Sequence, residues 1–245
     1  MVRNIAHRGF SGRYPENTLL AFEKALEAGA DGMELDVHLT KDNVLVIIHD
    51  EELERTTDGS GLVREHTYAQ LQKLDASATY CGVYGKNKIP TLEEYFELIQ
   101  GWDGITNIEL KNSIIDYDGI EERVLQMVER YSRKKDCVFS SFNHFSIQRL
   151  KALDSEASCG FLEESRMIAP AEYCMRYGVE CWHPYLHSLP RGIVQELQQA
   201  GIQINVWTVN THEDMEAMLK IGVQGVITNF PDLFAQVRQE WKAHH

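Results

Sequence analysis

Residues 202–228 read IQINVWTVNTHEDMEAMLKIGVQGVIT, and this stretch contains one complete repeat of the chain's pattern. The runs Ile202–Val209 and Val223–Thr228 are short and rich in Val and Ile, which is typical of buried strands. Glu213–Ile221 between them has apolar residues at helical spacing, and Gly222 follows at a position where helices commonly end. Two strands joined through a helix run parallel, because an antiparallel pair needs only a short turn. The stretch therefore predicts a βαβ unit.

The same alternation continues over the rest of the chain. We predict barrel strands at Arg3–His7, Gly32–Leu39, Thr106–Lys111, Cys137–Phe142, Ser158–Leu162, Val179–Tyr185, Ile202–Val209 and Val223–Thr228. We predict helices at Thr18–Ala28, Leu92–Gln100, Asp118–Arg133, His144–Leu153, Ala171–Tyr177, Arg191–Ala200, Glu213–Ile221 and Leu233–Lys242. Eight βα units in 245 residues favour an α/β fold closed as a (β/α)8 barrel, with residues 1–245 as a single domain. The alternative, a doubly wound open sheet, would carry a GxGxxG loop after its first strand, and residues 7–12 (HRGFSG) do not match it.

Two segments depart from this regular pattern. Val44–His49 is an extra strand whose connector to Gly32–Leu39 is too short for a parallel crossover, so it forms a hairpin. The hairpin carries His49 back beside residues 34–36, in a register that the sequence leaves open by one residue. Residues 50–90 have no crossover pattern and interrupt one βα unit, and long insertions of this kind usually serve binding. We expect a small cap over the barrel mouth.

Composition excludes some classes of protein. The formal net charge is −13, which argues against binding nucleic acid or anionic membranes through a broad basic face. No stretch approaches the roughly 18 apolar residues of a membrane span. The five cysteines are an odd number without CxxC spacing, so we expect buried free thiols in the reducing cytoplasm. The oligomeric state stays open, with a homo-oligomer among the possibilities.

Polar side chains gather at the ends of the first three predicted barrel strands, where barrel active sites form. These side chains are His7, Arg8, Glu34, Asp36, Glu109 and Lys111. Residues two apart on a strand face the same way, so the three carboxylates point together into the mouth and repel one another. A hard divalent cation would relieve that repulsion, and oxygen ligands favour one Mg²⁺ or Ca²⁺. The alternative is a set of surface ion pairs in which Lys111 bridges to Glu109.

His7 and His49 are candidates for general acid and general base, because imidazole titrates near neutral pH. Each alone would more often be a structural histidine, and their place beside the carboxylates argues for catalysis. Which of the two is the base is left open. The three carboxylates outnumber Arg8 and Lys111 by one charge, so a divalent ion turns the site positive and suits it to a phosphodiester. We therefore predict metal-dependent activity.

These residues resemble the glycerophosphodiester phosphodiesterase family, in particular its small bacterial members. The matching segments are His7-Arg8-Gly9, residues 15–18 (PENT), 34–37 (ELDV), His49-Asp50, 90–92 (PTL), 108–111 (IELK), Ser141-Phe142, 206–210 (VWTVN) and 227–229 (ITN). The resemblance implies a TIM barrel with a small insertion after the second strand. It implies hydrolysis of glycerophosphocholine, glycerophosphoethanolamine and similar diesters to sn-glycerol 3-phosphate and an alcohol.

The resemblance also implies roles for individual residues. It assigns acid and base chemistry to His7 and His49, metal ligation to the three carboxylates and phosphate contacts to Arg8 and Lys111. The nucleophile is water or the glycerol 2-hydroxyl, which would first form a cyclic phosphate. Asp50 could orient His49, although neighbours on a strand point apart.

Other strand ends carry further candidates. Phe142 and Trp207 are predicted to pack on the glycerol or the head group, with barrel core as the alternative. His183 could reach the mouth, but a structural role is favoured. Glu163-Glu164 could meet a cationic head group such as choline, and a solvated loop is the alternative. Asn229 takes a position where the family often has Asp, and we assign it no role.

Two other functions remain open at this point. A lysophospholipase D-like phosphodiesterase would share the barrel and the two histidines, but it needs room for an acyl chain. The insert, with Arg55, Asp58, Arg64 and Glu65, offers no long apolar wall. A non-catalytic binder of glycerophosphodiesters would lack a histidine or a carboxylate, and none is missing here.

Overall fold

Strands and helices alternate along the chain in the computed structural model, which describes residues 1–190 and 192–244. The parallel strands are β1 (Arg3–His7), β2 (Gly32–Leu39), β4 (Ile105–Leu110), β5 (Cys137–Ser141), β6 (Cys159–Glu163), β7 (Cys181–Pro184), β8 (Gln203–Val206) and β9 (Gly225–Thr228). Each pairs in parallel with its neighbours, and β1 pairs with both β9 and β2. The sheet is therefore closed, which confirms the TIM barrel and excludes the open sheet.

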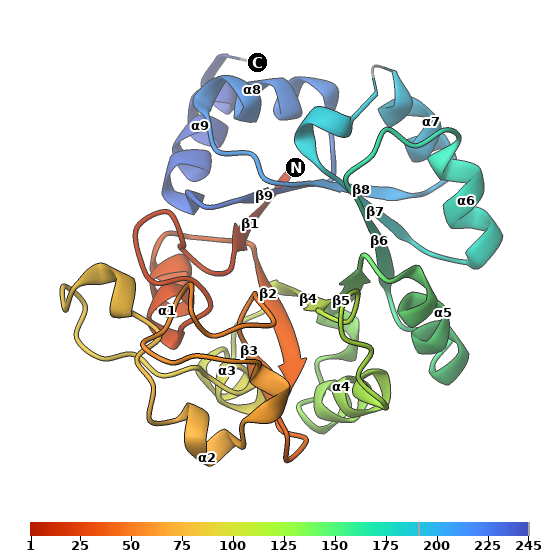
Figure 1. The fold of residues 1–245 in the computed structure, drawn as a ribbon. Coiled ribbons are helices and arrows are strands. Elements are labelled where there is room, and N and C mark those ends of the chain that lie inside the picture. The colour runs from red at the N-terminus through yellow and green to blue at the C-terminus, as the bar shows by residue number, and fades with distance from the viewer. Residues whose placement is uncertain (191, 245) are drawn as a thin grey trace.

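The helices cover the outside of this ring of strands (Figure 1). They are α1 (Leu19–Glu27), α3 (Leu92–Leu98), α4 (Ile120–Arg130), α5 (His144–Leu153), α6 (Pro170–Tyr177), α7 (Ile193–Gln199), α8 (His212–Ile221) and α9 (Pro231–His244). Each predicted helix is present, although the predicted first residue of the seventh, Arg191, lies outside the described residues. Short 3₁₀ turns at Lys134–Asp136 and Leu186–Ser188 precede β5 and follow β7.

Local sequence signals account for several helix ends. Thr18 accepts a hydrogen bond from the backbone N–H of Ala21, and Thr91 forms a capping box with Glu94. Gly178 and Gly222 end α6 and α8 with φ values of 65° and 75°, a conformation that costs glycine little. These contacts fix where each crossover turns back toward the barrel.

Strand register brings the polar residues together. His7 of β1 lies opposite Glu34 of β2, and Asp36 lies opposite Glu109 of β4. Side chains alternate along a strand, so Glu34 and Asp36 face the barrel interior while Leu35 and Val37 pack toward the helices. The interior at this end of the sheet is therefore lined with charges.

The exit from β1 depends on a glycine. Gly9 has φ +76°, and a Cβ atom there would lie 2.6 Å from the backbone carbonyl carbon of Ala21. A larger residue would therefore push the loop away from α1. The chain therefore leaves the first strand through a tight turn that packs directly on α1.

The predicted hairpin is present but shorter than expected. Strand β3 (Leu45–Ile47) runs antiparallel to β2, with Val37 opposite Ile47 and Leu39 opposite Leu45. The backbone N–H of Ile48 still donates to the Asp36 carbonyl at 3.1 Å, after which the chain leaves the sheet. Residues 48 and 49, predicted as strand, therefore follow its end.

The insert after β3 contains α2 (Tyr68–Leu71) and 3₁₀ turns at Val63–Glu65 and Ala78–Tyr80. It has a separate small hydrophobic core, formed by Val46, Ile48, Leu53, Val63, Leu71, Ala76 and Ile89. Its tip contacts the loop after β1, because the Tyr80 and Tyr84 hydroxyls donate to the carbonyls of Tyr14 and Arg13. The insert is thus attached at its base and at its tip.

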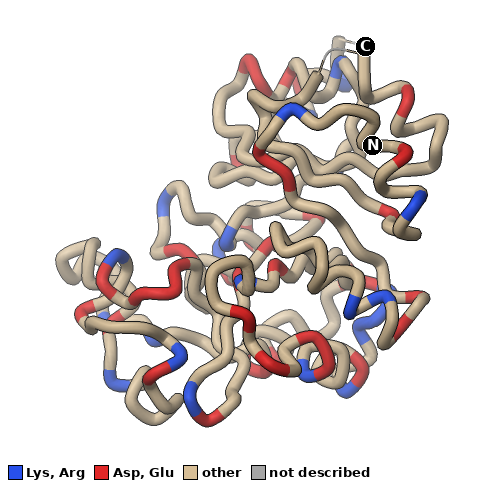
Figure 2. The backbone as a smooth tube through the Cα atoms, turned by 45° about the vertical axis from the view of Figure 1, so that its right-hand side comes forward, with Lys and Arg blue, Asp and Glu red and all other residues tan. Residues whose placement is uncertain are grey.

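Charged residues of both signs are interspersed along the backbone (Figure 2). None of the described helices is long and apolar enough to cross a lipid bilayer. The five cysteines are all free. Four of them are buried, as expected, whereas Cys81 is exposed, contrary to the expectation.

Candidate active site

The acidic cluster consists of Glu34, Asp36 and Glu109, which are all buried. One carboxylate oxygen from each lies within 4.8 Å of those from the others. Burial, and after it the charges of Asp36 and Glu109, raise the pKa of Glu34 well above its usual value. Burial also raises the pKa of Glu109, with Lys111 opposing it. The three groups therefore cannot all ionise cheaply without a compensating cation.

Asp36 behaves differently from the other two carboxylates. Burial acts to raise its pKa, yet neighbouring cations, Arg8 foremost, hold that pKa below its usual range. Its Oδ2 accepts from the Asn17 side chain at 2.7 Å, while Oδ1 is buried and has no hydrogen-bond partner. An ionised, unpartnered oxygen beside two further carboxylates is the donor set that a hard divalent cation needs. The residues present therefore fit such an ion.

Arg8 and Lys111 flank the acidic cluster. The Arg8 guanidinium lies 3.3 Å from Asp36 Oδ2 and 3.0 Å from Glu16 Oε1. Lys111 Nζ lies 2.9 Å from Glu109 Oε1 and 4.0 Å from Asp36 Oδ1. Glu109 and Asp36 raise the pKa of Lys111 more than burial lowers it, so the amine stays charged. Both cations are available to an anionic ligand in the cavity.

The His7 ring lies between Glu34 of the acidic cluster and Asn229, a residue near the C-terminal end of the chain. Its Nδ1 is 2.6 Å from Asn229 Oδ1, and its Nε2 is 3.8 Å from Glu34 Oε2. An amide oxygen can only accept, so Nδ1 carries the proton and Nε2 keeps its lone pair. Burial, and next the charge of Arg8, lower the pKa of His7 to about 3, which keeps the ring neutral. Asn229 follows the end of β9, which pairs with β1, and this position brings its side chain within reach of His7.

His49 lies between a carboxylate and an amine. Its Nδ1 is 2.5 Å from Asp50 Oδ1, and Lys111 Nζ is 3.2 Å from its Nε2. The sequence raises a doubt that Asp50 could orient His49, because adjacent residues on a strand point apart. That doubt is wrong here, because β3 ends at Ile47 and neither residue belongs to the strand. Arg55 donates to Asp50 and to Glu16, which links the insert to the partner of Arg8.

A buried histidine on β2 also holds this segment. His38 has Nε2 3.1 Å from the His49 carbonyl and Nδ1 3.0 Å from the Tyr117 hydroxyl. Because a carbonyl only accepts, Nε2 of His38 donates to the main chain of His49. The backbone that carries His49 is thereby attached to the second strand.

The predicted site residues other than Asp36 line one cavity of about 180 Å³. Its walls are His7, Arg8, Glu34, His49, Asn107, Glu109, Lys111, Phe142, Leu162, Glu164, Trp207 and Ile227. Phe142 and Trp207 thus lie at the cavity rather than in the core. His183 is fully buried, does not line the cavity and accepts from Asn205 at 3.0 Å, so its role is structural.

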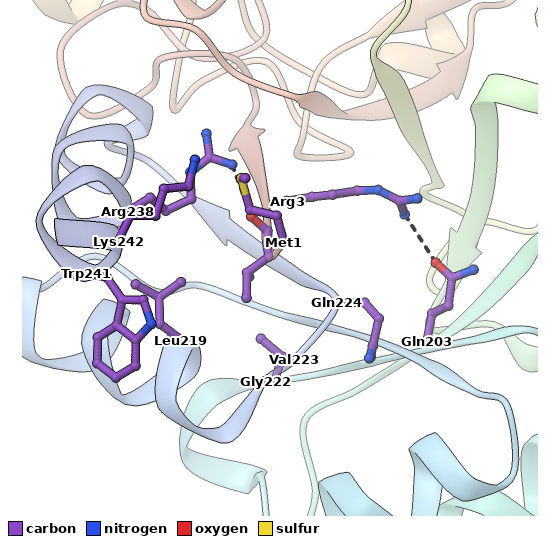
Figure 3. A pocket seen from close by; sticks show the side chains of 11 residues that line it. Met1, Arg3, Gln203, Leu219, Gly222, Val223, Gln224, Arg238, Trp241 and Lys242 are labelled. Atoms are coloured by element: carbon purple, nitrogen blue, oxygen red, sulfur yellow. Dashed lines mark hydrogen bonds between the residues drawn. The ribbon is translucent and has the colours of Figure 1, made fainter. Parts of the chain in front are cut away.

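A larger cavity of about 670 Å³ lies at the opposite end of the barrel (Figure 3). Arg3 and Gln203, joined by a hydrogen bond of 3.2 Å, come from the beginnings of β1 and β8, and Lys242 comes from α9. Barrel enzymes place their chemistry at the carboxyl ends of the strands, and the other end serves stability. The smaller cavity is therefore the candidate active site.

Sequence reasoning missed four supporting residues: Glu16, Asn17, His38 and Asn229. Glu16 and Asn17 stand in the PENT segment, so the family resemblance gave a signal, although no role was assigned to them. His38 continues the alternation of Glu34 and Asp36 on the inward face of β2. Asn229 belongs to a matching segment of the family, but nothing in the local sequence indicated its contact with His7.

Comparison with known proteins identifies relatives over nearly the whole chain. The model of the glycerophosphoryl diester phosphodiesterase family matches residues 7–233. A glycerophosphodiester phosphodiesterase of Caldanaerobacter subterraneus subsp. tengcongensis is 41% identical over 93% of this chain and 94% of that protein. One from Bacillus altitudinis is also 41% identical, over 99% of this chain and 100% of that protein.

A solved structure agrees with these sequence relatives. An Oleispira antarctica phosphodiesterase in complex with the product sn-glycerol-3-phosphate superposes with a TM-score of 0.88 and 31% identity. The match covers 96% of each chain. The fold and the relatives together define an enzyme that hydrolyses phosphoric diesters on a TIM barrel. The chain belongs to the glycerophosphoryl diester phosphodiesterase family.

Proposed function

We propose that this enzyme is a metal-dependent hydrolase that converts glycerophosphodiesters such as glycerophosphocholine and glycerophosphoethanolamine to sn-glycerol 3-phosphate and an alcohol. The observation that carries the proposal is that two imidazoles, two cations and the buried carboxylates Glu34 and Glu109 line one cavity, with Asp36 clustered beside those two carboxylates. That combination provides proton transfer, charge neutralisation and anion binding at one place. The product in the Oleispira antarctica relative supports glycerol 3-phosphate as the phosphate-bearing product.

Glu34, Asp36 and Glu109 would hold one Mg²⁺ or Ca²⁺. When bound, the ion supplies positive charge that polarises the phosphoryl oxygens and turns the site from net negative to net positive. Arg8 and Lys111 then bind the remaining phosphoryl oxygen and orient the diester for attack. Their present partners, Glu16 and Glu109, keep both side chains at the cavity wall. Because these donors are held in place beforehand, little reorganisation is needed when charge develops on the phosphate.

His7 and His49 transfer the protons. The free lone pair on His7 Nε2 makes it the acceptor, with Asn229 holding the proton on Nδ1. His49 would take the complementary role of donor to the leaving alcohol: its Nδ1 lies 2.5 Å from Asp50, which orients the ring, and its Nε2, now 3.2 Å from Lys111 Nζ, would deliver the proton. The proton accepted by His7 comes from water or from the glycerol 2-hydroxyl.

The size of the cavity argues against the lysophospholipase D-like alternative. Its volume of about 180 Å³ is smaller than the roughly 300–1,000 Å³ of typical drug-sized ligand sites. A cavity of that volume is too small to hold an acyl chain. We propose that residues 50–90 act as a cap subdomain that closes one side of this small site, within a single domain spanning residues 1–245. The contacts of Arg55 with Asp50 and Glu16 support that role.

We also propose a cytoplasmic location, which the buried free thiols support because a reducing compartment preserves them. Immunoblotting of fractionated native cells tests this; recovery of the protein outside the cytoplasm would contradict it.

A panel assay tests the proposed function. Release of glycerol 3-phosphate is measured from glycerophosphocholine, glycerophosphoethanolamine, glycerophosphoglycerol and lysophosphatidylcholine. We expect turnover of the three deacylated substrates, loss of at least about a hundredfold in rate after exhaustive chelation, and recovery on adding Mg²⁺ or Ca²⁺. Undiminished activity after chelation would contradict the metal dependence. Preferred turnover of lysophosphatidylcholine would contradict the substrate class.

A further inference from the structure

We propose that the wall of the cavity opposite the acidic cluster is a subsite for a cationic head group, formed by Glu164 together with the rings of Phe142 and Trp207. We call these three residues the head-group subsite. The inference rests on the proposed function, since it names the kind of substrate that the same site takes. It predicts a preference for choline and ethanolamine diesters over diesters with neutral head groups.

The cavity wall divides into two chemically different parts. The residues from β1 to β4 and the hairpin are charged or strongly polar and comprise His7, Arg8, Glu34, His49, Asn107, Glu109 and Lys111. The residues from β5 to β9 are apolar apart from one carboxylate and comprise Phe142, Leu162, Glu164, Trp207 and Ile227. A phosphate bound on the charged side leaves one of its two substituents facing the second part.

The aromatic part of the head-group subsite is held rigidly. The rings of Phe142 and Trp207 meet edge to face with centroids 5.6 Å apart, and the Tyr185 ring lies 5.4 Å from the indole on its other flank. Trp207 Nε1 donates to the His183 carbonyl at 2.8 Å, which fixes the plane of the indole. Fixed aromatic faces attract quaternary ammonium groups through the ring quadrupole.

Backbone hydrogen bonds tie the Glu164 loop to these rings. The N–H of Tyr185 donates to the Glu163 carbonyl at 2.8 Å, and the N–H of Leu186 donates to the Trp207 carbonyl. The ends of β6, β7 and β8 are therefore joined in order, and Glu164 follows directly after β6. This explains how an exposed residue comes to line the same cavity as Trp207.

Glu163 and Glu164 differ in what their carboxylates do. Glu163 Oε1 accepts from the N–H and the hydroxyl of Ser165, at 3.0 and 2.7 Å, so its charge is used within the loop. The Glu164 side chain makes no hydrogen bond or ion pair with any residue that the structure describes. Its carboxylate is free to pair with a ligand.

The charges at the two sides of the cavity orient a zwitterionic substrate. Arg8 and Lys111 attract the phosphate and repel an ammonium group, and a bound divalent cation would do the same. Glu164 is the single carboxylate among the described residues on the opposite wall. The head-group cation therefore gains by turning toward Glu164 and the aromatic rings. Because Glu164 is exposed, screening by water and salt limits the size of this preference.

The test compares two substrates in the intact enzyme. The quantity measured is the ratio of kcat/KM for glycerophosphocholine to that for glycerophosphoglycerol. Substitution Glu164→Gln should lower this ratio about fivefold, and Glu164→Lys about twentyfold, as expected when an exposed ion pair is lost or reversed. Glu196→Gln on α7 is the matched control, because Glu196 is also exposed and its ratio should stay at the wild-type value.

A binding measurement separates this inference from the proposed function. The Kd values of the same two diesters are measured by calorimetry in a His7→Ala background, with and without Glu164→Gln, and should change by the same ratio. Wild-type enzyme that turns over none of the diesters would overturn the proposed function, while the Kd ratio would still decide the subsite. Ratios that stay within twofold of the parent protein for both Glu164 variants would overturn the head-group subsite.

Discussion

The two halves of the barrel interior use buried polar groups in opposite ways. In β2 and β4 the buried polar side chains include three carboxylates, Glu34, Asp36 and Glu109. In β5, β7 and β8 they are neutral, as in Ser140, His183 and Asn205. Both halves are parts of one closed sheet, so strand geometry does not distinguish them.

The difference lies in charge, because both halves leave some buried polar atoms without a hydrogen bond. On the neutral side these atoms are Ser140 Oγ, His183 Nδ1 and Asn205 Oδ1, although His183 Nε2 accepts from the Asn205 amide. His183 lies 0% exposed beside Gly160, where a Cβ would come within 2.6 Å of its ring. On the charged side, Glu34 and Glu109 have raised pKa values because they are desolvated and lie beside the charge of Asp36. The charged half therefore keeps an unfavourable arrangement that a cationic ligand would relieve.

The largest expected effect comes from removing either imidazole on the charged side. His7→Ala or His49→Ala should lower kcat by about 10³-fold, because proton transfer to or from the diester is lost. Steady-state release of glycerol 3-phosphate measures this, and thermal unfolding checks that the fold persists. Activity within tenfold of wild type in either variant would contradict the assigned catalysis.

Asp50→Asn tests whether the insert contributes to the charged half. The amide cannot hold His49 Nδ1 by the charge-assisted hydrogen bond that the carboxylate makes, so the ring is oriented less well and kcat should fall about 10²-fold while KM changes little. Glu65→Gln, also within the insert, is the control and should behave as wild type. A change confined to KM would show that Asp50 acts on binding instead.

The neutral half predicts a dependence of stability on pH. Burial lowers the pKa of His183 to about 3, whereas an unfolded histidine titrates near 6.5. Below about pH 6.5 the unfolded chain binds a proton that the folded protein does not, so stability present at higher pH is lost progressively toward pH 3. His183 should account for about 2 kcal/mol of lost stability between pH 7 and pH 5.

Urea unfolding at the two pH values measures the change in the free energy of unfolding. The same measurement on His183→Gln should show a smaller loss, by about that amount, because the glutamine does not titrate. An identical pH dependence in both proteins would contradict the neutral state of buried His183.

The smallest effect should come from relieving the repulsion among the carboxylates. Glu34→Gln should raise the melting temperature of the metal-free enzyme by about 2–4 °C, which corresponds to about 1 kcal/mol in a chain of this size. The amide oxygen can still accept from the Arg8 N–H, which now lies 2.9 Å from the carboxylate. Stabilisation by added Mg²⁺ or Ca²⁺ should shrink in the same variant. A lower melting temperature of the Glu34→Gln variant in the absence of metal would contradict the repulsion among the carboxylates.

Much of the fold was accessible from local sequence. Arg3–His7 and Gly32–Leu39 have the predicted bounds, because each is followed at once by turn-forming residues, Arg8-Gly9 after the first and 40–43 (TKDN) after the second. Other ends were predicted too long, as at Ile202–Val209, where β8 covers only Gln203–Val206. There Trp207 makes only an isolated parallel bridge with Tyr185, in which its N–H donates to the Pro184 carbonyl. The local sequence pattern does not determine the residue at which backbone pairing between neighbouring strands ends.

The charged residues of the candidate site could be predicted from the sequence, but the residues that hold them in place could not. Strand periodicity places Glu34 beside Asp36 without knowledge of the rest of the chain. The contact of His7 with Asn229 joins residues 222 positions apart and exists only because β9 pairs with β1. The pairing of His49 with Asp50 depended on where β3 ends, which the alternation rule could not supply. Contacts that arise from closure of the barrel or from the end of a strand can be identified only from the three-dimensional structure.

The pairing of β1 with β9 also determines when the site is completed during synthesis. His7 leaves the ribosome well before Asn229, which lies 222 positions later in the chain. A nascent chain that lacks β9 leaves one edge of β1 unpaired and gives His7 no acceptor for its Nδ1 proton. Closure of the barrel around His7 therefore waits until synthesis has passed the last strand of the sheet, after all the other strands have been made.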